Sequence, residues 1–521
     1  MACRLVHPLA PPAPPRGSTT RSPRGPLRLL PLALCLTLGC LVGPGQAAES
    51  PPAEASADMA APLPAAWQNA GPHGSTAADD AMLIHWWEQF DDPLLQGLIR
   101  EALARNPDLR SARATLAQAQ ASRSVIAAGA QPQLSTPASA TRSRVDSSDS
   151  RLYKVGVSAS WELDWNHAIE AGVQSADATM RSAADDLATA RMVITSEVAL
   201  AYFQWRGAQW RQRVARANLD SLEETRQLVD WKAQAGLLSQ LDQDQARQSS
   251  EQTRAAWVAA HTEVTQDTHL LAQLTGRTPA DMGSTLDEDG RWPAADALIA
   301  RLQVGVPADL LRRRPDLRSA EALVVARWYG MVQTRREGEP TFALTGSLGL
   351  QATALKAITS GGAALVTALG LNIDWPIWEA GKREALVAEQ RAAWELTRIT
   401  YESALLVAVQ DVEDALVATR DSVDRCQALQ TATEAAQRVV DTQRQRHEAG
   451  LIDTATLLDS QRILLGLQTS LASARTDQAQ SLVRLYKSLG GGWSEEDIPT
   501  ATAPAPRPSG NPLSALFRNE P

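Results

Sequence analysis

The 521-residue sequence predicts a mainly α-helical fold that also contains membrane-type β-strands and an internal two-fold repeat. Three observations predict this class. Proline is absent from residues 138–278 and again from 377–498, and because an interior proline costs a helix about 3 kcal/mol, each span can hold a very long helix. Apolar and polar residues alternate over 153–165, as they do on a strand with two different faces. Motifs in the first half of the chain recur in the second.

The N-terminal leader predicts export from the cytoplasm. Basic residues precede the apolar run LLPLALCLTLGCLVG at 29–43, which is too short for a stable transmembrane helix and fits a signal peptide over residues 1–39. Two cleavage sites compete. One precedes Cys40, where LTLGC resembles a bacterial lipobox, and the other follows Ala47. We expect the first, which makes residues 40–80 an acylated N-terminal linker.

Two segments of the chain carry the same motifs in the same order. RNPDLRSA at 105–112 recurs as RRPDLRSA at 313–320, and AGLLS at 235–239 recurs as AGLID at 449–453. Two further pairs of matches lie between these, and the offset drifts only from 208 to 214 along the series. Ordered matches of this kind indicate a repeat rather than chance.

The repeats, at 81–276 and 306–489, each predict a helix, two strands, a very long helix and a return helix. The first long helix, at about 168–235, carries apolar residues at alternating spacings of four and three, which is a heptad seam. At 1.5 Å per residue it would be roughly 100 Å long. Its counterpart is expected at about 380–449. The Pro-rich end of the chain, 490–521, predicts a flexible C-terminal tail.

The strands predict a membrane sheet that one chain cannot close. The strand regions, at about 131–165 and 340–376, contain four strands long enough to span a bilayer, with an apolar side that would face lipid. The strand at about 131–145 is the exception in composition, because it is mostly Ser, Ala, Thr and Arg. Four strands cannot close a barrel, and an open edge in hydrocarbon leaves backbone groups unpaired at several kcal/mol each. Three chains would give a closed barrel of twelve strands, which the long helices would continue as a tube. A soluble four-stranded sheet packed on helices is the alternative.

Composition and motif searches argue against several other functions. The net charge of −9 gives no basic surface for nucleic acid. The seven histidines form no i,i+4 pair and lie near no cysteine, so we expect no metal site. No G-x-S-x-G motif or phosphate-binding loop occurs, and we expect no catalytic residues, no cofactor and no enzymatic activity. We expect Cys426 to be buried in a helix and His447 to lie on a helix surface.

Four longer motifs carry a resemblance to a known family. They are WWEQFDDPLLQGLIREALARNPDLRSARATLAQAQA (86–121), VPADLLRRRPDLRSAEALVVAR (306–327), AGLIDTATLLDSQR (449–462) and LYKSLGGGW (485–493). Over about residues 81–493 the chain resembles the TolC-like outer-membrane factor family, in particular its lipoprotein branch, which serves resistance-nodulation-division (RND) efflux pumps. The resemblance implies a homotrimeric duct, with a 12-stranded β-barrel in the outer membrane, a mixed equatorial region and a long α-helical barrel closed at its periplasmic end.

The resemblance also implies a periplasmic aperture. In the family, acidic residues at the sixth and ninth positions after the glycine of the second helix turn narrow this aperture. Here the glycine is Gly450 and the two positions are Thr456 and Asp459, so one of the two rings would be neutral. The constriction would then depend on Asp459, helped by Asp242 and Asp244 after the first turn, because carboxylates gathered around an axis repel one another and attract cations. For Asp242 and Asp244, solvated charges at a helix start are an equally simple interpretation.

The helix turns are also the expected docking surface for a periplasmic adaptor, which would act together with an inner-membrane pump. Apolar residues exposed beside a tight bend indicate a protein contact. Ser239 and Asp453 are in addition expected to cap the helices that follow. The turn residues are Gly236, Leu237, Leu238, Ser239, Gly450, Leu451, Ile452 and Asp453.

The function expected for residues 81–489 is that of the outer-membrane channel of a tripartite efflux system, which passively conducts small molecules such as drugs. Two alternatives stay open. The same duct could serve type I protein secretion or metal-ion efflux, because the cargo is chosen upstream of the channel. A structural coiled-coil protein anchored through Cys40 is the second alternative, and the alternating strands in both halves argue against it.

Overall fold

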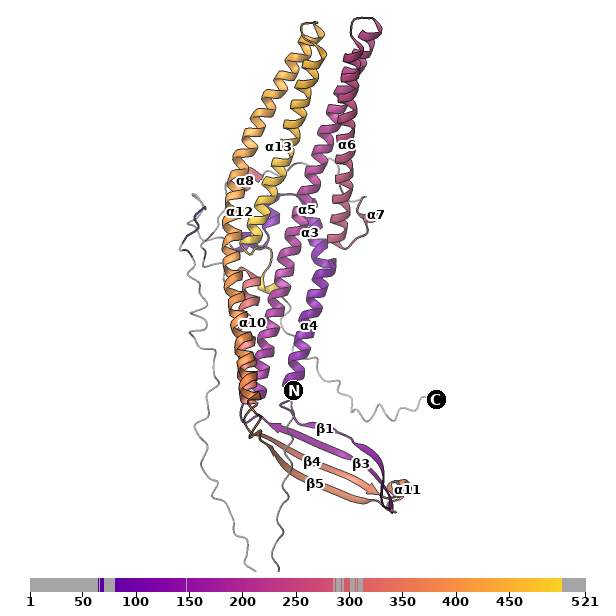
Figure 1. The fold of residues 1–521 in the computed structure, drawn as a ribbon, viewed down its shortest axis with the longest axis vertical. Helices are drawn as coiled ribbons and strands as arrows, with labels where there is room; N and C mark the ends of the chain where they lie inside the picture. Colours follow the sequence, from indigo (N-terminus) through magenta and orange to yellow (C-terminus); the bar gives the residue numbers. More distant parts are fainter. Residues whose placement is uncertain are drawn as a thin grey trace, which may run out of the picture. The chain divides into compact units, whose positions relative to one another are not determined.

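The computed structural model describes residues 64, 66–69, 80–146, 148–283, 286, 292, 295–299, 305, 307 and 313–498. All of them lie in one of the two compact units of the chain, residues 49–521. Helices form most of this unit, and an antiparallel sheet lies beyond their ends (Figure 1). The expected signal peptide at 1–39, the lipidation site Cys40 and most of the linker at 40–80 lie outside the described residues.

Two pairs of long helices run side by side (Figure 1). α5 (Ala168–Gln234) and α12 (Lys382–Glu448) have 67 residues each and lie where the sequence predicts very long helices. α6 (Gln240–Thr275) returns along α5, and α13 (Thr454–Ser488) returns along α12. Both long helices begin next to the sheet, so the two turns that end them lie at the opposite end of the unit (Figure 1).

Three helices of intermediate length pack on the long ones: α3 (Pro93–Arg105), α4 (Pro107–Ala128) and α10 (Pro315–Arg336). α4 and α10 lie on the sheet-proximal part, and α3 lies near the middle of α5, where α6 ends (Figure 1). Each begins with a proline, whose fixed φ and missing N–H suit the first helical position. Among the described residues, we find no helix that combines the length and the apolar character required of a membrane-spanning helix. The remaining short elements are α2 (Asp80–Ile84), η2 (Trp86–Phe90), α7 (Pro279–Met282), α8 (Ala295–Ile299), α11 (Leu355–Thr359) and η4 (Glu495–Asp497).

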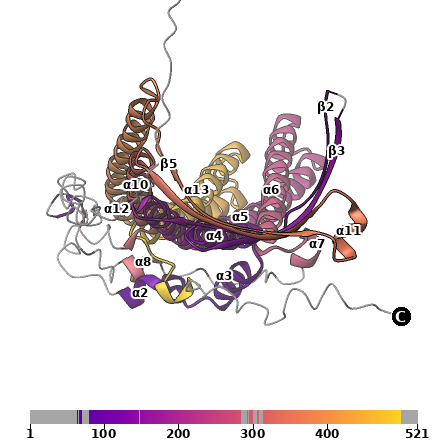
Figure 2. The same cartoon turned by 90° about the horizontal axis from the view of Figure 1, so that it is seen from below.

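The sheet is curved and antiparallel throughout (Figure 2). β3 and β4 are neighbours, β5 flanks β4, and β1 and β2 pair one after the other with the free side of β3. Pro137 lies between β1 and β2, where a residue without an N–H cannot continue the ladder. The strand predicted at 131–145 is therefore interrupted. The strands are β1 (Gln133–Ser135), β2 (Ala138–Val145), β3 (Ser148–Leu163), β4 (Thr341–Ala352) and β5 (Ala364–Asp374).

The main hydrophobic core lies where α5 and α13 meet the short N-terminal elements. Trp86 stacks on Tyr486 with ring centroids 5.4 Å apart, and Phe90 contacts Phe203 at 5.0 Å. At the middle of the helix pairs the core therefore consists largely of aromatic rings, and not of the small aliphatic residues that form the heptad seam nearer the sheet. Cys426 is buried in α12, as the sequence predicts.

The end of the described chain is folded beyond the boundary predicted from sequence. The flexible tail is expected from residue 490, but Trp493 is buried and its indole N–H donates to the carbonyl oxygen of Arg313 at 3.0 Å. The guanidinium of Arg318 lies 5.1 Å from the Trp493 ring centroid and also pairs with Glu495 at 2.9 Å. The tail prediction is therefore wrong for residues 490–498, because one buried tryptophan holds a segment whose composition is otherwise typical of a linker.

Candidate functional site

The sheet has one apolar and one polar face. In its register Val155 lies opposite Leu350, and Leu350 lies opposite Leu365, so the three side chains share a face. The apolar face comprises Tyr153, Val155, Val157, Trp161, Leu163, Phe342, Leu344, Leu348, Leu350, Leu365, Leu369, Leu371 and Ile373. The opposite face includes Lys154, Ser158, Ser160, Glu162, Thr345, Ser347, Gln351 and Asn372. The alternation predicted for 153–165 thus continues across three strands.

The apolar face has the height of a bilayer core. Ten residue steps separate Tyr153 from Leu163, about 33 Å at 3.3 Å per residue, which becomes roughly 25 Å for a strand tilted by about 40°. Leu369, in the middle of β5, is 82% exposed. The described chain therefore leaves a continuous apolar surface uncovered, as is typical of a surface that contacts lipid or protein.

Aromatic residues gather at the end of the sheet next to the helices. The indole N–H of Trp165 donates to the carbonyl oxygen of Pro340 at 2.6 Å, and its ring contacts Phe342 edge-on at 5.5 Å. Trp375 and Trp378, just after β5, are exposed. Amphipathic rings at the edge of an apolar band are typical of a membrane–water interface.

Both edges of the sheet are open within the described residues. β5 pairs only with β4 on one side, and β1 and β2 pair only with β3 on the other. An edge strand presents a row of unpaired N–H and C=O groups, and hydrocarbon offers them no hydrogen-bonding partner. A sheet with this apolar face therefore needs further strands at both edges before it can lie in a bilayer.

The first helix turn joins α5 to α6 far from the sheet. Gly236 has a φ of +75°, and the N–H of Leu237 donates to the carbonyl oxygen of Lys232 at 2.9 Å, which is a Schellman end. Ser239 begins α6 with a capping box, in which the Asp242 carboxylate accepts from the Ser239 N–H at 2.9 Å. Hydrogen bonds from the Ser239 hydroxyl and N–H hold the pKa of Asp242 below its usual value.

The second turn, between α12 and α13, repeats this backbone. Gly450 has a φ of +71°, and the N–H of Leu451 donates to the carbonyl oxygen of Arg446 at 2.9 Å. Asp453 caps α13 by accepting from the N–H of Thr456 at 2.9 Å, and it also accepts from the Thr456 hydroxyl. These hydrogen bonds lower the pKa of Asp453. Ser239 and Asp453 are thus helix caps, as the sequence predicts.

Only part of the predicted docking surface is exposed. Leu237 and Leu451 are 73% and 74% exposed, and Ile452 is half-buried. Leu238 is also half-buried, because it packs against the small cluster that closes the end of the helices. The cluster contains Leu222, Val229, Ala246 and Leu458. The exposed apolar part of each turn is therefore a single leucine next to the glycine.

The residues predicted for the aperture fall into two groups. Asp242 and Thr456 are engaged in helix capping. Asp244 and Asp459 are exposed one to two turns into α6 and α13, and Asp459 also accepts a hydrogen bond from Arg462. Sequence reasoning missed this pair, although its i,i+3 spacing on a helix predicts such a contact.

His447 is buried, so the prediction that it lies on a helix surface is wrong. It lies seven residues after the buried Val440 on α12, and this heptad spacing was the signal for burial. Its Nε2 is 3.3 Å from the Thr454 hydroxyl. Burial lowers the pKa of His447 below its ordinary value, and the nearby charge of Lys232 lowers it further.

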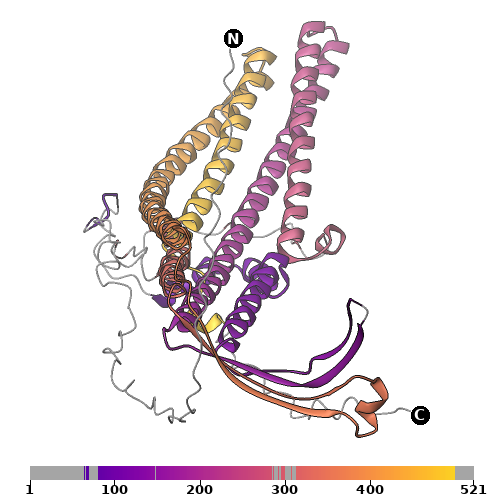
Figure 3. The same ribbon diagram turned by 60° about the horizontal axis from the view of Figure 1, so that its bottom comes forward.

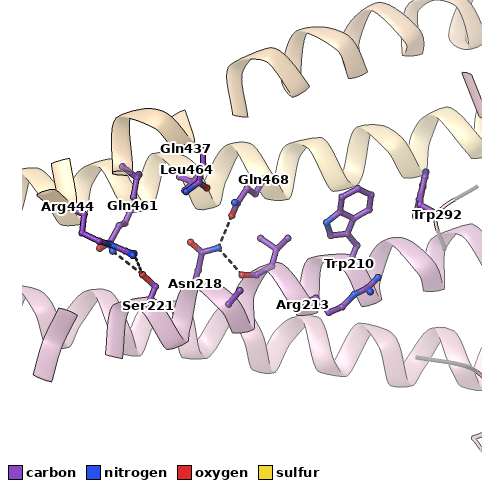
Figure 4. A pocket seen from close by; sticks show the side chains of 13 residues that line it. Trp210, Arg213, Asn218, Ser221, Trp292, Gln437, Arg444, Gln461, Leu464 and Gln468 are labelled. Atoms are coloured by element: carbon purple, nitrogen blue, oxygen red, sulfur yellow. Dashed lines mark hydrogen bonds between the residues drawn. The ribbon is translucent and has the colours of Figure 1, made fainter. Parts of the chain in front are cut away.

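A groove of about 600 Å³ lies between α5, α12 and α13 (Figure 4). Across it the Asn218 amide donates to Gln468 at 2.8 Å, and Arg444 donates to the Ser221 hydroxyl at 2.8 Å. Trp210 and Trp292 lie toward the other end of the groove (Figure 4). No nucleophile paired with a base lines this groove, and the described residues contain no group of three His, Cys, Asp or Glu side chains that could hold a metal ion.

Comparison with known sequences finds one family. The model described as outer membrane efflux protein matches the chain at residues 98–277 and again at 306–491. The toluene efflux pump outer membrane protein TtgC of Pseudomonas putida is 30% identical over 448 residues, which cover 84% of this chain and 91% of the relative. The pyoverdine export outer membrane protein OpmQ of Pseudomonas aeruginosa is 30% identical over 483 residues, or 89% and 97% of the two chains.

Solved structures of channels are similar over most of their length. The outer-membrane channel OprN aligns with a TM-score of 0.74 at 30% identity, covering 83% of this chain and 98% of that chain. The MtrE outer membrane channel of Neisseria gonorrhoeae, solved in its open state, aligns with a TM-score of 0.72 at 26% identity and covers 83% and 96%. The similarity therefore extends over nearly all of each solved channel.

Proposed function

The chain belongs to the outer membrane efflux protein family, and we propose that it is the outer-membrane channel through which an efflux pump passes small molecules, such as drugs, to the exterior. The observation that carries this proposal is the two-faced sheet, from which two 67-residue helices continue. The apolar face suits hydrocarbon, and the opposite face, with Lys154, Ser158 and Glu162, suits water. Transport through such a duct is passive, because the partner pump supplies the energy.

A homotrimer is the assembly that this sheet favours. β3, β4, β5 and the β1–β2 edge together supply four strand positions, so three chains give a closed barrel of twelve strands. A barrel of that size holds an aqueous lumen, whereas about eight strands are filled by their own side chains. Closure also pairs both open edges, which removes the cost of unpaired backbone groups in hydrocarbon. The long helices would then line up as an α-helical barrel that continues the lumen, and the paired motifs along the chain would be an internal two-fold repeat.

The partners in this proposal are a periplasmic adaptor and an inner-membrane pump, with an RND pump as the favoured type. The adaptor would dock on the exposed Leu237 and Leu451, because each leucine lies beside a rigid Schellman turn at the end of the unit away from the sheet. A fixed backbone with one protruding apolar side chain loses little conformational entropy on binding. The rest of each turn is occupied by the caps of α6 and α13.

Deletion of the gene tests the proposed transport. Cells that lack the chain should accumulate more of a fluorescent efflux substrate than cells complemented with the wild type, because the pump then has no exit. A matched control is complementation with Asp421→Ala, which removes an exposed aspartate of α12 far from both turns and should restore efflux fully. Unchanged accumulation in the deletion strain would contradict the efflux function, and loss of a secreted protein instead would favour the secretion duct.

The aperture is proposed to depend chiefly on Asp459. Its carboxylate is exposed on α13, whereas Thr456 and Asp242 are engaged in capping, and Asp244 lies exposed on α6 as the second candidate. Three copies of Asp459 around a common axis would repel one another and attract cations. The partner Arg462, one turn further along the same helix, would hold the carboxylate in place on each chain.

Conductance in planar bilayers tests the aperture. Asp459→Ala should raise the conductance of the resting channel and lower its preference for cations, and Asp244→Ala should have a smaller effect. Asp421→Ala serves as the control of equal charge. If Asp459→Ala and Asp421→Ala conduct alike, Asp459 has no role in the aperture.

The contact between residues 67–69 and α12 supports lipidation of Cys40, because it limits how far Cys40 can lie from the sheet. Trp67 is buried, and the backbone N–H groups of Gln68 and Asn69 donate to the Glu413 carboxylate at 2.7 and 3.1 Å. The 27 residues from Cys40 to this contact can span at most about 90 Å. The part of α12 that separates Glu413 from the sheet is only about 47 Å long at 1.5 Å per residue, so a lipid on Cys40 can reach the membrane.

Mass spectrometry of the mature N-terminal peptide decides between the two cleavage sites. A peptide that begins with a diacylglyceryl-modified Cys40 supports the lipoprotein. A peptide that begins after Ala47 contradicts it, and Cys40→Ala would then leave the mature protein unchanged.

A further inference from the structure

The hairpin formed by β2 and β3 extends past the rest of the sheet. The last pair between β3 and β4 is Tyr153 with Ala352, whereas β2 continues to pair with β3 as far as Val145 with Ser148. The hairpin projects from the end of the sheet that lies away from the helices (Figure 3). In the proposed barrel this end faces the exterior.

The projecting part of the hairpin carries a cluster of arginines on one face. Arg142 lies directly opposite Arg151, and Arg144 lies directly opposite Asp149. On β3, Arg151 and Asp149 alternate in step with Tyr153 and Val155 and so lie on the apolar face. Arg142 and Arg144 lie directly opposite them on β2, so they share this face and not the polar one. Three positively charged side chains and one negatively charged side chain therefore lie on this face just beyond the apolar band. Asp146 lies at the turn beyond them.

The charges of this cluster are incompletely compensated within the chain. Asp149 accepts from Arg142, with Nη2 at 2.7 Å. Within the part of the chain that the structure describes, the side chains of Arg144 and Arg151 have no hydrogen-bond or ion-pair partner. Like charges directly opposite each other destabilise a strand pair, so the opposed Arg142 and Arg151 favour an anion between them.

The depth of Arg142 and Arg151 matches that of lipid headgroups, and Arg144 lies just beyond them. Arg151 lies two residues beyond Tyr153, about 7 Å along the strand, and Asp149 lies about 13 Å beyond it. For a tilt of about 40° these steps correspond to roughly 5 and 10 Å past the end of the apolar band, and the polar headgroup region of a bilayer is about 5 to 7 Å thick on each side. Guanidinium groups bind phosphate oxygens in a bidentate manner.

We propose that Arg142, Arg144 and Arg151 bind the phosphate groups of outer-leaflet lipids whose headgroups carry phosphomonoesters, such as lipid A. This inference rests on the proposed placement of the sheet in the outer membrane. The apolar band selects a lipid over free phosphate, because acyl chains can lie along the band while the headgroup reaches the arginines. The contact would hold the barrel at a fixed depth in the membrane and neutralise the like charges of the opposed arginines.

Native mass spectrometry of the full-length trimer in detergent tests the proposal, with lipid A and chemically dephosphorylated lipid A as probes. The wild type should bind lipid A more tightly than the dephosphorylated form. Arg144→Gln combined with Arg151→Gln should weaken lipid A binding by roughly 30-fold, from about fivefold per arginine at a membrane surface, and should leave binding of the dephosphorylated lipid unchanged. Arg144→Lys with Arg151→Lys should retain most of the affinity.

Lys154→Gln is the matched control, because Lys154 lies on the same strand but on the polar face. It should bind lipid A as the wild type does. Equal binding of both lipids by the wild type, equal losses in Lys154→Gln and the double variant, or displacement of lipid A by excess inorganic phosphate would each overturn the proposal. A wild-type chain that stays monomeric in detergent would overturn the proposed channel and this inference with it, and the trimer mass in the same spectra reports that outcome separately.

Discussion

α5 and α12 have the same length but very different surroundings. Each contains 67 residues, yet α5 has 28 buried residues and α12 has 12. α5 packs on α4, α6, α10 and α13, whereas α12 packs chiefly on α10 and α13. α12 is therefore an edge helix of this chain. Although the two helices occupy corresponding places in the two halves, they are not equivalent in the single chain.

The uncovered face of α12 is apolar at several positions. Leu396, Ile399 and Leu406 are exposed, and they follow spacings of three and seven residues, so they lie along one side of the helix. At the other edge of the helix layer, α4 lies beside the sheet-proximal part of α5 (Figure 1) and exposes Val125 and Ile126. In the proposed trimer these two edges would meet between neighbouring chains, and burial would then become similar for the two halves.

A charge on the uncovered face of α12 should have the largest effect on this comparison. Leu406→Arg is expected to prevent trimer formation, because it places an unpaired charge in an apolar contact at a cost of several kcal/mol. The protein should still fold, since Leu406 is exposed in the single chain. Light scattering after size-exclusion chromatography in detergent measures the assembly state.

The control for this variant is Asp421→Arg, because Asp421 is also exposed on α12 but does not follow the heptad spacing of Leu406. It should leave the trimer intact. A Leu406→Arg protein that remains trimeric would show that α12 is an edge for another reason, and the unequal burial of α5 and α12 would then persist in the assembly.

Two glycines sharpen the contrast between crowded and open positions on the helices. An added Cβ at Gly207 on α5 would overlap the Thr476 hydroxyl of α13, whereas one at Gly466 on α13 would meet nothing within 4 Å. Gly207→Ala should therefore destabilise the protein by about 1–3 kcal/mol. Gly466→Ala should stabilise it by up to about 1 kcal/mol, because alanine loses less backbone entropy in a helix. Thermal unfolding midpoints of the two variants compare them directly, and equal shifts would contradict the close approach of α5 and α13.

The smallest expected effect concerns the two turns. His447 is buried three residues before Gly450, whereas the equivalent position before Gly236 is Ala233. Because the pKa of His447 is lowered in the folded state, the neutral ring is favoured there. The stabilisation of the folded turn by the neutral His447 ring is fully present above the ordinary pKa of 6.5. It decreases as the pH falls below that value, because the unfolded turn binds the proton more readily than the folded turn does.

Hydrogen exchange measures this difference between the turns. After correction for intrinsic rates, amides around Gly450 should exchange severalfold faster at pH 5.5 than at pH 7.5, and amides around Gly236 should change less. His447→Gln should abolish the extra pH dependence at the second turn. The control is His261→Gln on α6, where the ring is near the surface and bonds to Gln212. If the extra pH dependence persists in His447→Gln, it arises from other groups, such as Asp453, and not from His447.

The sequence predicts the regular elements well and the local contacts poorly. The proline-free spans and the alternation at 153–165 are strong predictors of helix and strand, because in each case one physical cause acts over many residues. The cause is the absence of a helix breaker in the first case and the polarity of the two strand faces in the second. The interruption at Pro137, the buried Trp493 and the buried His447 each depend on a single residue and on a partner more than 100 residues away or across a turn. Such contacts leave no periodic signal. The caps at Ser239 and Asp453 were predictable because capping is local.

The central claim is that the apolar face of the sheet contacts lipid and the polar face contacts water. Leu369 and Ala368 are neighbours in the middle of β5 and lie on opposite faces, so arginine at each position tests the claim with the same charge on the same strand. Leu369→Arg should strongly reduce the yield of heat-modifiable trimer assembled in lipid bilayers, because arginine near the bilayer midplane costs about 2–4 kcal/mol. Ala368→Arg should assemble normally and alter only conductance. Equal assembly of the two variants, or the reverse order, would contradict the account.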